Sequence, residues 1–160
     1  MEALATYLHD HLAGSHFAIK LLDSLAEQYA GEGLGAFATL MCQEIQADQA
    51  VLEQIIEHVG RASLDLTEAI GWLGEKATAF KLSRDADGPG LGTFEALEML
   101  TLGIRGKMAL WQVLRAISEF DRRIPAQDFE QLLARAEQQF DQVESKRLEL
   151  ANVVFRPDEG

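Results

Sequence analysis

The chain has 160 residues, 48% of them apolar and 25% charged, a composition that fits one globular domain and excludes a disordered segment. Its 26 acidic residues outnumber the 14 basic ones and give a formal net charge of −12, so nucleic acid and anionic membranes are not expected partners. Cys42 is the one cysteine, which excludes a disulfide framework, and neither a signal peptide nor a long apolar run is found, so we expect a cytoplasmic protein.

The first part of the chain predicts two long helices joined by a tight turn. Apolar residues recur at helical spacing over residues 2–30 and again over residues 34–59. The glycine-rich stretch 31–35 separates the two segments, and Gly60 follows the second one as a predicted C-terminal cap. Because the connection is so short, we expect these helices to pack as an antiparallel hairpin.

A second helical hairpin is predicted in the last part of the chain. Its first helix opens at Thr93, a residue suited to cap a helix N-terminus, and its apolar stripe continues to Ile117. The following turn ends at Pro125, which suits the first turn of a helix over residues 126–154. Residues 156–160 then form a short polar tail.

A long connection, residues 61–92, separates the two hairpins. It contains a shorter amphipathic pattern that starts near Asp65 and predicts an extra helix. A connection of this length can cross the whole bundle, so that the second and third long helices run parallel. We therefore predict an all-α fold, a four-helix bundle with a long crossover, formed by residues 1–155 as a single domain. An up-down bundle with a decorated loop and a five-helix array are the alternatives.

Two hairpins joined by one long crossover resemble the ferritin-like superfamily. The likeness covers helix lengths and connection order along nearly all of the chain. The stretches Tyr7–Ser15 and Leu102–Trp111 also resemble those of small uncharacterised bacterial ferritin-like proteins, a likeness that implies no activity.

The superfamily resemblance implies a site for two iron or manganese ions in the middle of the bundle. Catalytic members supply a glutamate from each of two helices and a Glu-x-x-His pair from each of the other two, and this sequence contains no Glu-x-x-His. Partial substitutes are Glu44 and Asp48 on one predicted helix, Asp141 and Glu144 on another, and His16 on a third. Counting residues from the turns places all five at similar depth, so they are the candidate metal ligands.

The same counting places two cations, Arg105 and Lys107, at that depth. Arginine cannot ligate a metal ion, and a buried cation beside carboxylates forms ion pairs that replace the charge of a metal. We therefore interpret the layer as a polar network with a degenerate metal site and expect no cofactor.

Three functions follow from these observations. The first is a non-catalytic interaction or scaffold protein that forms a homodimer. The second is a di-metal carboxylate protein that binds iron or manganese for storage, oxidation or peroxide removal. The third is a bundle that binds a small apolar ligand between four core positions, namely Met41, Met108, Trp111 and Phe140.

Overall fold

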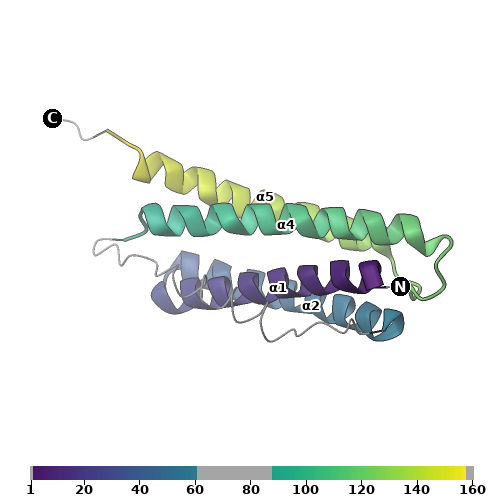
Figure 1. The fold of residues 1–160 in the computed structure, drawn as a ribbon. Helices are drawn as coiled ribbons and strands as arrows, with labels where there is room; N and C mark the ends of the chain where they lie inside the picture. Colours follow the sequence, from purple (N-terminus) through teal and green to yellow (C-terminus); the bar gives the residue numbers. More distant parts are fainter. Residues whose placement is uncertain (1, 61–87, 158–160) are drawn as a thin grey trace.

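The computed structural model describes residues 2–60 and 88–157, and within these ranges the chain forms four α-helices and no β-strand (Figure 1). The helices are α1 (Glu2–Gln28), α2 (Gly33–Val59), α4 (Leu91–Ser118) and α5 (Phe129–Val154). This confirms the prediction of an all-α chain with four long helices. The predicted extra helix near Asp65 and most of the predicted crossover lie outside the described residues.

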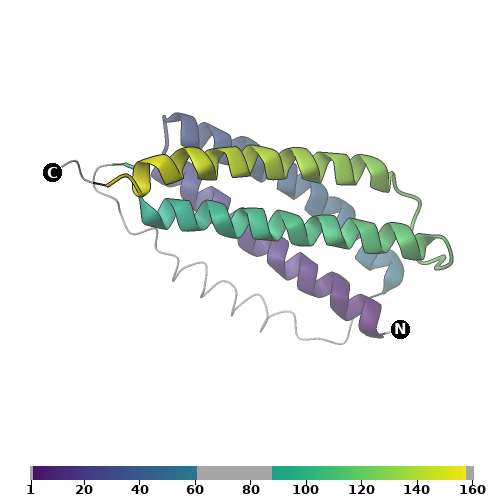
Figure 2. The same cartoon turned by 90° about the horizontal axis from the view of Figure 1, so that it is seen from above.

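The four helices form two layers, each an antiparallel hairpin. α1 packs on α2 and α4 packs on α5, and the main helix contact between the layers joins α1 to α4 (Figure 1). The colour gradient shows that α2 and α4 run in the same direction, so α2 ends and α4 begins at opposite ends of the bundle. Figure 2 shows that the two hairpins cross at an angle. The middles of all four helices therefore surround one central region.

The turn between α1 and α2 requires a glycine at position 35. A Cβ atom on Gly35 would lie 2.1 Å from the carbonyl oxygen of Tyr29, a contact that no side chain can make. The phenol of Tyr29 meets the hydroxyl of Thr93 at 2.6 Å in a buried contact. The turn of the first hairpin is thereby fastened to the beginning of α4 in the second.

The helix ends differ from two of the sequence predictions. Thr93 does not cap α4, because Gly90 holds that position and the Thr93 hydroxyl is used in the contact between the hairpins. Pro125 does not open α5 either, because the carboxylate of Asp128 caps that helix by accepting a backbone N–H of the first turn at 3.0 Å. Gly60 does follow α2, with a φ of 96°, which confirms the predicted glycine cap.

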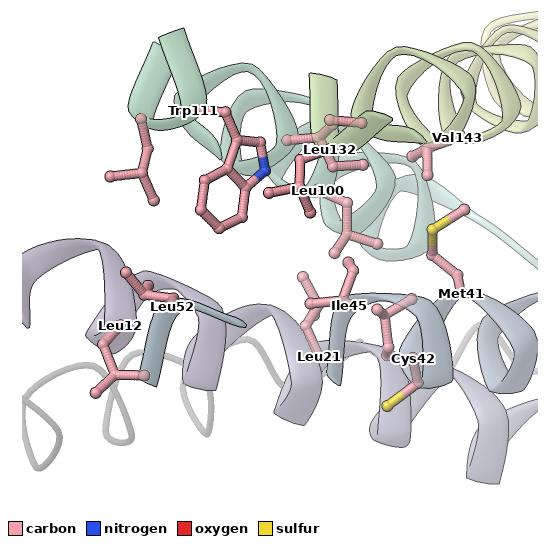
Figure 3. Close-up of a cluster of buried hydrophobic side chains, with 14 of the residues drawn as sticks. Leu12, Leu21, Met41, Cys42, Ile45, Leu52, Leu100, Trp111, Leu132 and Val143 are labelled. Carbon is pink, nitrogen blue, oxygen red and sulfur yellow. The ribbon is translucent and has the colours of Figure 1, made fainter. Parts of the chain in front are cut away.

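Apolar side chains from both layers fill the middle of the bundle (Figure 3). Leu22, Ile55, Leu114 and Val143 are fully buried, and Trp111 is 1% exposed. Burying a side chain of this size stabilises the fold by about 1.5–3 kcal/mol, so this core is the main source of stability. Among the described residues, no helix combines the length and the apolar character needed to cross a membrane.

Candidate functional site

A buried polar cluster lies between the two layers near the middle of the bundle. At its centre is Asp48 of α2, which is 2% exposed. The Lys107 ammonium of α4 donates to Asp48 Oδ2 at 2.5 Å, and the Arg135 guanidinium of α5 donates to Asp48 Oδ1. Both carboxylate oxygens of this aspartate are therefore held by cations from the opposite layer.

Gln139 of α5 completes the cluster, and its side chain is fully buried. Its amide oxygen accepts a hydrogen bond from Lys107, while its amide nitrogen donates to Glu44 Oε2 at 3.1 Å and to Asp48 Oδ2 at 3.2 Å. Residues four apart share a helix face, which is why Glu44 and Asp48 on α2 can meet Arg135 and Gln139 on α5. We refer to these four residues and Lys107 as the central cluster.

The charges of the central cluster balance, with two carboxylates facing one ammonium and one guanidinium. Burial lowers the pKa of the Lys107 ammonium below the usual lysine value, and the charge and hydrogen bond of Asp48 oppose that shift. Arg135 adds to the lowering because it is a second positive charge nearby. The protonated state of Lys107 thus depends on Asp48.

A partly open cavity of about 200 Å³ lies beside the central cluster, between α1, α2 and α4. Asp48 and Lys107 form part of its wall. Most of the rest is apolar, and the apolar lining consists of Ala18, Ile45, Leu52, Leu100, Ile104, Leu110 and Trp111. The indole of Trp111 extends into the space between the layers, with its ring nitrogen on the side of Leu100 (Figure 3). That nitrogen is buried and has no hydrogen-bond partner within the described part of the chain.

The structure brings three of the predicted site residues together and leaves four apart from them. Glu44, Asp48 and Lys107 belong to the central cluster. His16 is engaged elsewhere, because its Nδ1 lies 3.2 Å from the amide nitrogen of Gln49. Asp141 is exposed on α5.

The other two predicted residues, Glu144 and Arg105, contact side chains of α5 that do not belong to the central cluster. Glu144 forms an ion pair with Arg147 at 2.7 Å, and this hydrogen-bonded partner lowers the pKa of the Glu144 carboxyl. Arg105 is exposed, and its guanidinium lies 4.0 Å from the centre of the Phe140 ring. Lys107 is therefore the cation that α4 contributes to the interior, and Arg105 is not.

Two members of the central cluster, Arg135 and Gln139, were not predicted from the sequence. The signal for Gln139 was present, because it continues the spacing of Leu132, Ala136 and Val143 along the inward face of α5. A polar residue at such a core position requires buried partners. Arg135 gives no comparable signal, since an arginine beside an apolar stripe is common on solvated helix surfaces.

The central cluster does not match the donor set of a di-metal carboxylate centre. Such a centre takes four carboxylates and two imidazoles, whereas here two carboxylates meet, and both oxygens of Asp48 already accept from cations. Across residues 2–60 and 88–157, no group of three or more His, Cys, Asp or Glu side chains is placed to hold a metal ion.

The ligand position predicted between four core residues also differs from the structure. Of Met41, Met108, Trp111 and Phe140, Trp111 lines the cavity and the other three do not. The open space lies on the α1 side of the central cluster, and Gly14, Gly103 and Gly106, which have no side chain, are among its lining residues. Comparison with protein-family models, curated proteins and solved structures gave no match to this chain.

Proposed function

We propose that this chain is a ferritin-like bundle that lacks a working di-metal centre and acts by binding, as a homodimeric interaction protein in the cytoplasm. Two antiparallel hairpins whose second and third long helices run in the same direction support the ferritin-like order (Figures 1 and 2). In that fold the metal centre lies where the middles of the four helices meet. The central cluster also lies near the middle of this bundle, which supports the comparison.

One observation carries the proposal that no metal is used: Asp48 binds two protein cations. A metal ion entering between Glu44 and Asp48 would have to displace both Lys107 and Arg135, and each would then lie beside a divalent cation. Arginine offers no ligand atom, and a protonated lysine offers none either. The arrangement favours an ion-pair network over a site for iron or manganese.

The test is the metal content of protein expressed with added iron and manganese and purified without chelator or affinity tag. We expect background metal by mass spectrometry, with a fully helical circular dichroism spectrum. Stoichiometric iron or manganese that is lost in Glu44→Ala and kept in Glu53→Ala, an exposed glutamate of the same helix, contradicts the proposal and favours the di-metal alternative.

The homodimer is proposed from an exposed apolar stripe on α4. Met99, Leu102 and Val113 share one face of this helix and are 38%, 61% and 41% exposed. Large apolar side chains gathered on one face are typical of an interaction surface. Light scattering after size exclusion should give a dimer that Leu102→Glu dissociates. Leu148→Glu, on an exposed leucine of α5, is the matched control and should leave the dimer intact.

A further inference from the structure

The cavity beside the central cluster has the size and walls of a small-molecule site. Its volume of about 200 Å³ exceeds the roughly 150 Å³ of an engineered apolar cavity that binds benzene. Leu52, Leu100, Ile104 and Leu110 supply aliphatic walls from two helices. Pockets of this kind bind molecules that are mainly apolar and are oriented by a few polar groups.

Two residues that line the cavity, Trp111 and Lys107, have hydrogen-bond donors that are not fully used. The indole N–H of Trp111 is buried and finds no acceptor among the residues that the structure describes. The Lys107 ammonium has three N–H bonds and donates to two acceptors, Asp48 and Gln139. A buried donor without a partner destabilises the protein, so a ligand that supplies an acceptor is favoured.

Two of the acceptors on the same wall, Asp48 and Ser15, are already occupied, and a third, Asp10 of α1, is an exposed carboxylate. Asp48 accepts from Lys107, Arg135 and Gln139, and Ser15 Oγ accepts from Gln49 at 2.8 Å. On the side of Trp111 and Lys107 the wall therefore calls for an acceptor on the ligand, and Asp10 adds a negative charge on the α1 side.

The charge balance of the central cluster decides between a neutral and an anionic acceptor. The negative charges of Glu44 and Asp48 balance the positive charges of Lys107 and Arg135, so the cluster has no uncompensated positive charge. A carboxylate entering this apolar space would be an additional charge beside Asp48, with a desolvation cost that no free cation repays.

From these features we propose that the cavity binds a small, mainly apolar molecule that carries one neutral hydrogen-bond acceptor, such as an aryl ketone, oriented by the Trp111 N–H. This site is additional to the proposed function and does not depend on it, because neither the metal content nor the dimer enters the argument. The acceptor accepts from the indole, with Lys107 as the neighbouring second donor, while the ring of the ligand fills the aliphatic part.

The experiment uses the full chain and three probes of one shape: acetophenone, ethylbenzene and benzoate. They share a benzene ring and differ in carrying a neutral acceptor, no acceptor or a negative charge. Binding is followed by the indole N–H signals in proton–nitrogen NMR spectra, where Trp72→Phe identifies the signal of Trp111. We expect acetophenone to move the Trp111 proton downfield in a saturable way, because hydrogen bonding deshields that proton. Ethylbenzene should bind roughly three- to tenfold more weakly, the range of one net hydrogen bond. Benzoate should also bind more weakly than acetophenone, because no free cation compensates its charge.

Three variants test the location of the site. Trp111→Phe should weaken acetophenone by roughly three- to tenfold and leave ethylbenzene nearly unchanged. Ala18→Leu fills the cavity from α1 and should abolish binding of both, while Ala36→Leu, the same change at an exposed position of α2, should not. Melting curves establish that each variant is folded.

Each of the other outcomes contradicts the inference. If acetophenone and ethylbenzene bind equally and the indole signal does not shift, the ligand's acceptor plays no part in binding. Tighter binding of benzoate overturns the charge argument. Absence of saturable binding by all three probes to the folded protein removes the site itself, and it leaves the metal and dimer proposals untouched.

Discussion

Replacing Asp48 by asparagine removes the charge on which the central cluster depends while keeping nearly the same shape. Asp48 is 2% exposed and accepts from Lys107, Arg135 and Gln139. In Asp48→Asn the Lys107 ammonium loses its nearest counter-charge inside the bundle. Removing one partner of a buried ion pair costs about 3–5 kcal/mol, since the remaining charge is left uncompensated. We expect a loss of this size in the free energy of unfolding at neutral pH.

Urea unfolding followed by circular dichroism measures this loss, because a domain of ordinary stability stays folded after it. The matched control is Glu130→Gln, which removes the same kind of charge from an ion pair with Arg115. Those two side chains are 75% and 52% exposed, so this pair contributes under about 1 kcal/mol. The difference between the two variants isolates the effect of burial.

The pH dependence of Asp48→Asn identifies Lys107 as the group responsible. Burial lowers the folded-state pKa of Lys107, and removing Asp48 takes away the main contribution that opposes this shift. Between that lowered pKa and the usual value of 10.5, the unfolded chain holds the lysine proton and the folded chain does not. Stability should therefore rise with pH across this window, more steeply in Asp48→Asn than in the wild type. A flat pH profile, with a loss no greater than that of Glu130→Gln, would refute the buried ion pair.

Three further predictions concern stability and reactivity. Gly35→Ala should destabilise the protein by about 1–3 kcal/mol, since its Cβ would lie 2.1 Å from Tyr29 O. Gly14→Ala, in open space on α1, should instead stabilise the protein by up to about 1 kcal/mol, and thermal melts compare the two variants. Tyr29→Phe should cost about 1 kcal/mol in urea unfolding, because it removes the buried contact between the hairpins. The thiol of Cys42 should resist alkylation in the native protein at pH 8 and react after unfolding, because burial and a bond to Asp23 raise its pKa to about 11; rapid labelling without denaturant would contradict this.

The four helices could be predicted because each carries its own periodic signal. Apolar residues at spacings of three and four define the buried faces, and glycine-rich or proline-containing turns separate the segments. The helix ends were less predictable, because their caps depend on contacts made after folding. Thr93 is suited to cap a helix, yet its hydroxyl is drawn into the core by Tyr29 of the other hairpin. Asp128 caps α5 three residues after the expected proline.

The central cluster was only partly predictable, for a reason that applies to any site built from several helices. Periodicity says which side of a helix faces inward, and counting residues from the turns placed Glu44, Asp48 and Lys107 at one depth. It says nothing about how far one helix slides past another or how strongly two hairpins cross. That register decides that Asp48 meets Arg135, whereas Glu144 turns to Arg147 on its own helix.

The same limit applies to the cavity. Its apolar walls are residues that each read as ordinary core, and the space lies between α1, α2 and α4, where Gly14, Gly103 and Gly106 add no side chain. An indole N–H without an acceptor has no signature in a sequence, since a tryptophan that packs fully and one that lines a pocket show the same apolar spacing. A gap in packing is a property of the assembled layers, so a ligand site of this kind becomes visible when the three-dimensional arrangement is known.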